Sequence, residues 1–151
     1  MANPPYAALM GDPCGWRGNQ RNGVWRNLLG PGSPVRHTPE SRRAFEAALV
    51  ADLRATADRY PGDERLRRLI AELRANSDRF AELWESGTVG RHEAARKIID
   101  HPRVGSLTLD CDALTVAGSD LRIMIYTAEP GTEDAERLAL LAGLGTHSLA
   151  G

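Results

Sequence analysis

Apolar residues recur at helical spacing through the first half of the chain. After a Thr38-Pro39 start, apolar residues return every fourth position at Phe45, Leu49 and Leu53, which predicts a long helix ending at Pro61-Gly62. Two more helices follow, capped by Asp63 and by Ser77, and Gly87 closes the second of them. Their apolar stripes are Leu66, Leu69, Ile70 and Leu73, and then Phe80, Leu83 and Trp84. We also expect short helices near 3–11 and 24–29, the latter inside a glycine- and proline-rich segment spanning 11–39.

In the second half of the chain, apolar residues recur at every second position. Leu107 and Leu109 alternate with polar residues, and after a turn at 117–120 the same alternation returns at Leu121, Ile123 and Ile125. This pattern predicts strands with one buried and one mixed face, and 94–99 suits a further strand. Thr132 starts a final helix with the stripe Leu138, Leu141 and Ala142, and we expect the tail after Gly143 to fray.

The order of these elements defines the fold class. Helices come first, an antiparallel β-meander follows, and one helix ends the chain. The turns between the strands are too short for parallel crossovers. The sequence therefore predicts an α+β protein.

Composition narrows the function classes. The chain has 151 residues, 42% hydrophobic and 26% charged, which is typical of one soluble globular domain. A net charge of -1 argues against a dedicated nucleic-acid binder. No apolar run is long enough to span a membrane, and the N-terminus lacks the basic-then-apolar pattern of a signal peptide, so we expect a cytoplasmic protein.

The charge is unevenly placed. Residues 1–43 carry six arginines against Asp12 and Glu40, whereas 120–151 carry two arginines against five acids. The basic segment could meet an anion, but internal complementarity with the acidic segment is the favoured interpretation.

Catalytic and metal-binding constellations are not found in the sequence. Cys14 and Cys111 do not make a disulfide framework. Asp110-Cys111-Asp112 carries groups that could bind a metal, but strand alternation sends neighbouring side chains to opposite faces. We therefore expect that the protein is not an enzyme and holds neither a metal nor a cofactor.

The helices at 63–74 and 77–86 have the spacing of a helix-turn-helix motif. The second one would have to enter the major groove, yet it carries Asp78, Glu82 and Glu85 against Arg79 alone. Repulsion by phosphates makes DNA binding by this chain a disfavoured hypothesis.

Several residues allow both a structural and a ligand-binding interpretation. His101 precedes Pro102 and could either cap a turn, which is favoured, or anchor a polar group at a pocket mouth. Arg21 could pair with a neighbouring acid, also favoured, or bind a carboxylate in a bidentate manner. Four aromatic residues suit a core but could equally line a cavity: Trp25, Phe80, Trp84 and Tyr126.

An ordered set of landmarks resembles the ligand-binding domain of MmyB-like transcription regulators, found mostly in actinobacteria. The landmarks span about 3–142 and include Asn3-Pro4, Gly11-Asp12, Arg21-Asn22, Leu53-Arg54, Pro61-Gly62-Asp63, Phe80 with Trp84, Val89, His101-Pro102, Val104-Gly105, Leu107-Thr108-Leu109 and the segment from Tyr126 to Thr132. The segment 23–44 departs from the family pattern, because it lacks a Phe-x-Asp-Pro piece and a later tryptophan.

The resemblance implies a PAS-like sensor domain over 1–143, followed by a flexible tail at 144–151. It also implies an internal apolar cavity for a fatty-acid-like ligand, at a hollow seam between the helical half and the meander. Full-length relatives carry a helix-turn-helix DNA-binding domain that this chain lacks, so DNA is a partner only through that domain. A homodimer is a further expected partner, and no membrane is expected.

The candidate ligand-binding residues follow from chemistry and position. Arg21, Arg26 and His101 are the candidates for a carboxylate head group, which needs a cation or solvent when it leaves water. The apolar part would contact Trp25, Phe80, Trp84, Leu107 and Tyr126. The alternative function is a dimerisation or protein-interaction module with a filled core.

Overall fold

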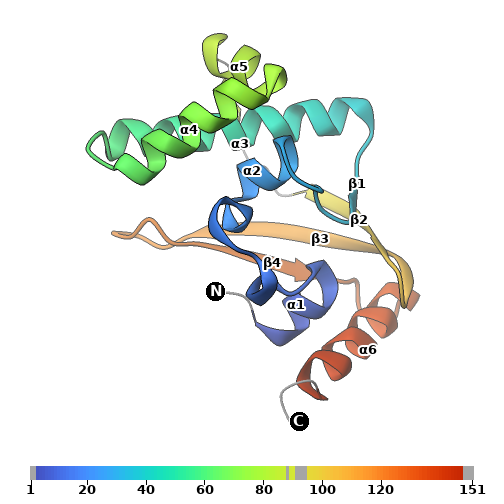
Figure 1. The fold of residues 1–151 in the computed structure, drawn as a ribbon. Coiled ribbons are helices and arrows are strands. Elements are labelled where there is room, and N and C mark those ends of the chain that lie inside the picture. Colours follow the sequence, from blue (N-terminus) through green and yellow to red (C-terminus); the bar gives the residue numbers. More distant parts are fainter. Residues whose placement is uncertain (1–2, 88, 91–94, 148–151) are drawn as a thin grey trace. The chain divides into compact units, whose positions relative to one another are not determined.

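A computed structural model describes residues 3–87, 89–90 and 95–147. The described elements are six α-helices, two short 3-10 helices and one four-stranded antiparallel sheet in the order β1-β2-β3-β4 (Figure 1). The α+β class and the order of elements are therefore confirmed, whereas the PAS-like architecture stays a prediction. The chain divides into two compact units.

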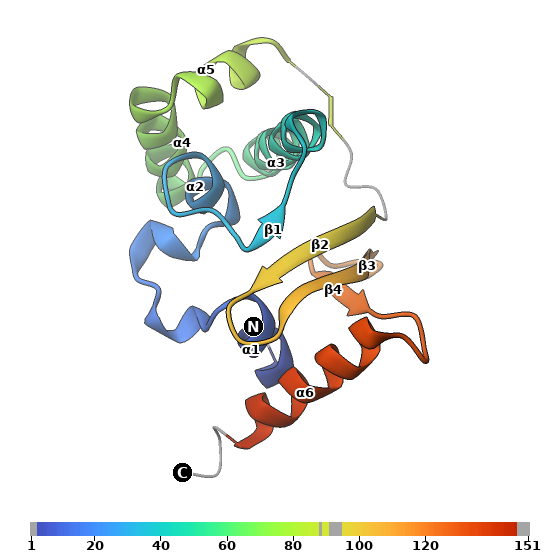
Figure 2. The same ribbon diagram turned by 90° about the vertical axis from the view of Figure 1, so that its right-hand side faces the viewer.

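Unit 1 contains residues 1–15, 34–36 and 93–151. Its sheet consists of β1 (Val35–Arg36), β2 (Ala95–His101), β3 (Gly105–Thr115) and β4 (Arg122–Thr127). Helices α1 (Pro4–Met10) and α6 (Glu133–His147) pack against each other on one face of this sheet (Figure 2). The core between helices and sheet is aliphatic: Leu9, Ile99, Leu107, Leu109 and Leu141.

Unit 2 contains residues 16–33 and 37–92. Helices α3 (Pro39–Arg59), α4 (Glu64–Asn76), α5 (Asp78–Glu85) and the short α2 (Gly23–Leu28) enclose a separate core. That core contains Val24, Val50, Leu53, Leu69, Leu73, Phe80 and Leu83. The short helix η2 (Gly18–Arg21) leads into α2, and η1 (Pro13–Gly15) precedes it in unit 1.

Capping residues begin the helices where the sequence predicts them. Thr38 Oγ1 accepts from the Ser41 N–H at 3.1 Å, and Asp63 Oδ1 accepts from the Leu66 N–H at 3.0 Å. Ser77 and Thr132 cap α5 and α6 in the same way. Each cap satisfies an N–H that has no partner within its helix, and so sets the helix start.

Three sequence predictions need correction. β1 lies in the segment predicted as loops and short helix, and it is only two residues long, too short for an alternating pattern to show. Helix α6 runs to His147, beyond the predicted fraying point at Gly143, and 148–151 lie outside the described residues.

The third correction concerns the outer half of the β3–β4 hairpin. Apolar residues that alternation assigned to a buried face are exposed, including Leu121 at 56% and Ile123 at 43%. Alternation identifies a face of a strand, but only packing partners bury it. In unit 1, helices α1 and α6 pack over the inner part of the sheet, on the opposite face (Figure 1).

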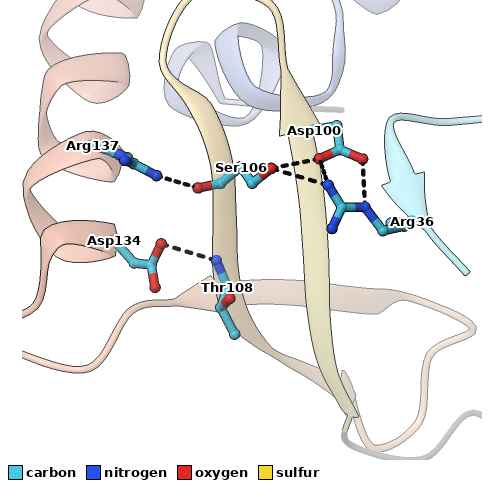
Figure 3. A network of polar contacts seen from close by, with 6 residues as sticks. All are labelled: Arg36, Asp100, Ser106, Thr108, Asp134 and Arg137. Atoms are coloured by element: carbon cyan, nitrogen blue, oxygen red, sulfur yellow. Dashed lines mark hydrogen bonds and ion pairs between the residues drawn. The ribbon is translucent and has the colours of Figure 1, made fainter.

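Polar contacts join β1, β2, β3 and α6 within unit 1 (Figure 3). The Arg36 guanidinium donates to both oxygens of Asp100 and to Ser106 Oγ, and Ser106 Oγ donates to Asp100. These contacts attach the two-residue β1 to the rest of the sheet.

Candidate functional site

The eight predicted ligand-binding residues fall in both units. Unit 2 holds Arg21, Trp25, Arg26, Phe80 and Trp84, and unit 1 holds His101, Leu107 and Tyr126. The convergence of the two sets on one cavity stays a prediction.

Two arginines are held by the backbone of residues 16–20. Asn22 caps α2, and its Oδ1 accepts from the N–H groups of Val24 and Trp25, which sets where this helix starts. Just before the cap, Arg21 Nε donates to the Trp16 carbonyl at 3.1 Å, while the side chain remains exposed. Just after it, Arg26 donates to the Gln20 carbonyl at 2.9 Å.

The Arg26 guanidinium also lies over an aromatic ring. It is 3.9 Å from the centroid of Trp16, within the range of a cation–π contact. Two guanidinium groups and an indole are thus present on one short segment. This combination offers positive charge beside apolar surface.

The indole N–H of Trp25 has a hydrogen-bond partner. Its Nε1 donates to Glu72 Oε1 at 2.8 Å, and Asn19 donates to the other oxygen of the same carboxylate. The Trp25 ring packs against the core of unit 2. Glu72 therefore fastens the segment that carries Arg21 and Arg26 to α4, a role that the sequence analysis missed because the partners are 47 and 53 residues away.

Phe80 and Trp84 form a stacked pair. Their ring centroids are 5.4 Å apart, and Phe80 is fully buried in the core of unit 2. The core interpretation holds for Phe80, while Trp84 is half-buried beside it.

Arg54 secures the end of the helix that carries this pair. Its guanidinium lies 5.2 Å from the Trp84 ring centroid and donates to the carbonyls of Leu83 and Trp84. A cation at the C-terminus of α5 satisfies carbonyls without partners in the helix and is favoured by the helix dipole.

His101 uses both ring nitrogens inside unit 1. Its Nδ1 accepts from the Arg103 N–H at 3.2 Å, so Nε2 is assigned the hydrogen and donates to the Ala8 carbonyl at 2.8 Å. The turn-capping interpretation is confirmed by this geometry. Leu107, six residues on, is fully buried in the core of unit 1.

Tyr126 sits opposite Cys111 in the sheet, among groups of mixed polarity. The Tyr6 ring centroid and the Lys97 Nζ are each 5.9 Å from its ring. Burial raises the pKa of the Tyr126 phenol above its ordinary value, and the Cys111 thiol, itself buried, raises it further. Tyr126 is therefore a neutral, half-buried phenol at ordinary pH.

The Asp110-Cys111-Asp112 segment does not gather its side chains. Asp110 forms an ion pair with Arg96 at 3.1 Å on one face, while the Cys111 side chain is buried on the other. Among the residues that the structure describes, no three His, Cys, Asp or Glu side chains converge as metal ligands do. None of the described helices is both long and apolar enough to cross a membrane.

One comparison with known proteins gives a match. A family model described as "MmyB-like transcription regulator ligand binding domain" matches residues 1–141. No curated protein and no solved structure matches the chain.

Proposed function

The chain belongs to the MmyB-like transcription regulator ligand-binding domains, and on this premise we propose that it is a non-catalytic sensor of a fatty-acid-like molecule. The family match carries the ligand-binding part of this proposal. Ligand binding would shift a homodimer or an attached DNA-binding domain between two states. The proposal includes a cytoplasmic location.

The head group is assigned to the segment that carries Arg21 and Arg26. A carboxylate that leaves water needs a cation or hydrogen-bond donors, and a guanidinium offers both in one plane. Arg21 is the stronger candidate because its side chain is exposed while its Nε bond to the Trp16 carbonyl restrains it. His101 is the weaker one, because binding would displace contacts to Ala8 or Arg103.

The hydrocarbon part supplies the affinity in this proposal. Burying about a dozen methylene groups yields roughly 10 kcal/mol before costs, at about 0.8 kcal/mol each. Association and ordering consume several kcal/mol of that. With a cost near the lower end, about 4 kcal/mol, about 6 kcal/mol remains, which corresponds to a dissociation constant of tens of micromolar.

Native mass spectrometry of gently purified protein tests the proposal. A co-purified mass of a lipid, or retention of added dodecanoate over dodecanol, supports the sensor. Arg21→Ala and His101→Ala should weaken retention of dodecanoate more than of dodecanol, with the larger effect at Arg21. Arg65→Ala, which removes an exposed arginine from α4, is the matched control. Equal affinity for both compounds in all variants would contradict the head-group assignment.

The alternative is a dimerisation or protein-interaction module that takes no ligand. The complete burial of Phe80 and Leu107 among the core residues of the two units favours it. A mass without ligand, together with no response to dodecanoate, would support this alternative instead.

A further inference from the structure

Glu72 is the point at which α4 holds the segment that carries the two head-group arginines. Trp25 Nε1 donates to Glu72 Oε1 at 2.8 Å, and the Asn19 side-chain amide donates to Glu72 Oε2. Each oxygen of this carboxylate therefore accepts a hydrogen bond from the same short stretch of chain. All three residues belong to unit 2.

The carboxylate stands on a fixed support. Glu72 lies on α4 between Leu69 and Leu73, whose side chains are buried in the core of unit 2. The Glu72 side chain is itself half-buried, where donors to both oxygens offset the loss of water. The position of Glu72 is thus set by the core and not by the segment that it holds.

The two anchored residues stand beside the two arginines in the chain. Asn19 precedes Arg21 by two residues, and Trp25 immediately precedes Arg26. The Asn22 N–H donates to the Asn19 carbonyl at 2.9 Å, so Arg21 lies inside a turn that begins at an anchored residue. Fixing Asn19 and Trp25 therefore fixes the backbone at both guanidinium-bearing positions.

A second turn passes the restraint on to the Arg26 side chain. The Arg17 N–H donates to Gln20 Oε1 at 3.0 Å, and the Gln20 N–H donates back to the Arg17 carbonyl at 3.1 Å. The Gln20 carbonyl then accepts from the Arg26 guanidinium at 2.9 Å. Asn19 lies within this turn, so its bond to Glu72 also holds the acceptor that orients Arg26.

We propose that Glu72 is a positioning residue that sets the preference of this site for carboxylic acids over neutral lipids. The inference rests on the proposed function and deepens it, because it names the residue that acts through Arg21 and Arg26. Glu72 does not touch the ligand in this account. It holds the donors in place before the ligand arrives.

The physical reason is preorganisation. A guanidinium recognises a carboxylate through bonds of fixed direction, so a mobile arginine must be ordered at the moment of binding, and that ordering lowers the affinity. A hydroxyl head group gains less from a fixed guanidinium, and the hydrocarbon part gains nothing. Loss of the Glu72 contacts should therefore weaken binding of an acid more than binding of the matching alcohol.

Dissociation constants of dodecanoate and dodecanol for variants of the full chain test the inference. Glu72→Ala should raise the dissociation constant of dodecanoate by about tenfold and that of dodecanol by less than about twofold. Asn19→Ala, a change at an exposed residue that removes one of the two contacts, should have a smaller effect in the same direction. Glu72→Gln, which keeps one acceptor oxygen, should also retain part of the preference.

Two controls separate positioning from charge and from general loss of stability. Glu64→Ala removes a negative charge from the same helix at a residue that pairs with Arg67 and Arg68, and should leave the preference unchanged. In chains that already carry Arg21→Ala, the added Glu72→Ala should lower the preference less than it does in the wild type. Such non-additivity is expected only if Glu72 acts through the arginine.

Hydrogen exchange without ligand measures the restraint directly. In Glu72→Ala the backbone amides of Gln20 and Asn22 should exchange faster, while that of Leu53, buried on α3, should not change. Unchanged exchange at Gln20 and Asn22 would overturn the inference.

The binding results distinguish the inference from its premise. If the wild type prefers dodecanoate and Glu72→Ala keeps or increases that preference, the inference is wrong and the proposed function stands. An increase in both Glu72→Ala and Glu72→Gln would show that the negative charge of Glu72 opposes the ligand. If the wild type does not prefer dodecanoate, the head-group assignment is wrong and the inference is overturned with it.

Discussion

The surroundings of Tyr126 in the sheet change how readily its phenol ionises. Alternation places it on the face of β4 opposite Ile123 and Ile125, and the structure puts its ring beside Tyr6 and opposite Cys111. Burial raises the pKa of its phenol above that of the unfolded chain, which is near 10.0. The raised pKa links the stability of the fold to alkaline pH.

Tyr126→Phe should remove part of the alkaline loss of stability. Below pH 10 both states keep the proton, so the contribution of the neutral phenol is fully present. Above pH 10 the unfolded phenol ionises first, and the wild type loses up to about 1.4 kcal/mol of unfolding free energy per pH unit. Urea unfolding at neutral pH and above pH 10 measures this slope, with the exposed Tyr60→Phe as control. The same slope in wild type and Tyr126→Phe would contradict the assignment.

Other residues show which roles can be read locally. Thr38, Asp63, Ser77 and Thr132 were predicted as caps, and each accepts the expected backbone N–H. The roles of Glu72 and Arg54 were not predicted, because their partners are distant in sequence.

At the scale of elements, α6 holds the edge of β3 where β4 departs. Asp134 takes the place of a strand carbonyl for the Thr108 N–H, and Arg137 takes the place of a strand N–H for the Ser106 carbonyl. The sequence shows acidic residues in the first turn of this helix and explains them by the helix dipole alone. The structure adds a specific backbone partner.

Asp134→Ala should open this contact. The Thr108 amide would lose its acceptor, so its hydrogen exchange should accelerate, and the free energy of unfolding should fall by about 1–2 kcal/mol. Hydrogen exchange followed by NMR measures the first effect and urea unfolding the second. Glu136→Ala, an exposed acid on the same helix, is the control and should change neither. Unchanged exchange at Thr108 would show that the contact does not protect it.

At the scale of the whole molecule, two compact units each enclose a core of their own. The sequence treats 1–143 as one domain, and the family match covers both units as one ligand-binding domain. A ligand of the proposed kind should therefore stabilise the chain as a whole.

Dodecanoate should raise the stability of the native chain by mass action. At a free concentration of a hundred times the dissociation constant, the gain is about 2.7 kcal/mol. Thermal unfolding followed by circular dichroism measures the shift, with dodecanol, which lacks the carboxylate, expected to give a smaller one. Chains carrying Arg21→Ala should show a smaller shift with dodecanoate than the wild type. An unfolding temperature insensitive to dodecanoate would argue for the interaction module instead.

The sequence by itself determined the helices, their caps, the strand alternation and the α+β order, because periodicity and capping act over a few residues. Only the tertiary structure decided the distant partners, such as Glu72 for Trp25 and Asp134 for Thr108. It also decided that the hairpin beyond Cys111 is exposed, since an apolar face is buried only where another element returns to cover it. The spacing of residues along the chain does not show which element covers an apolar face, because tertiary packing decides it.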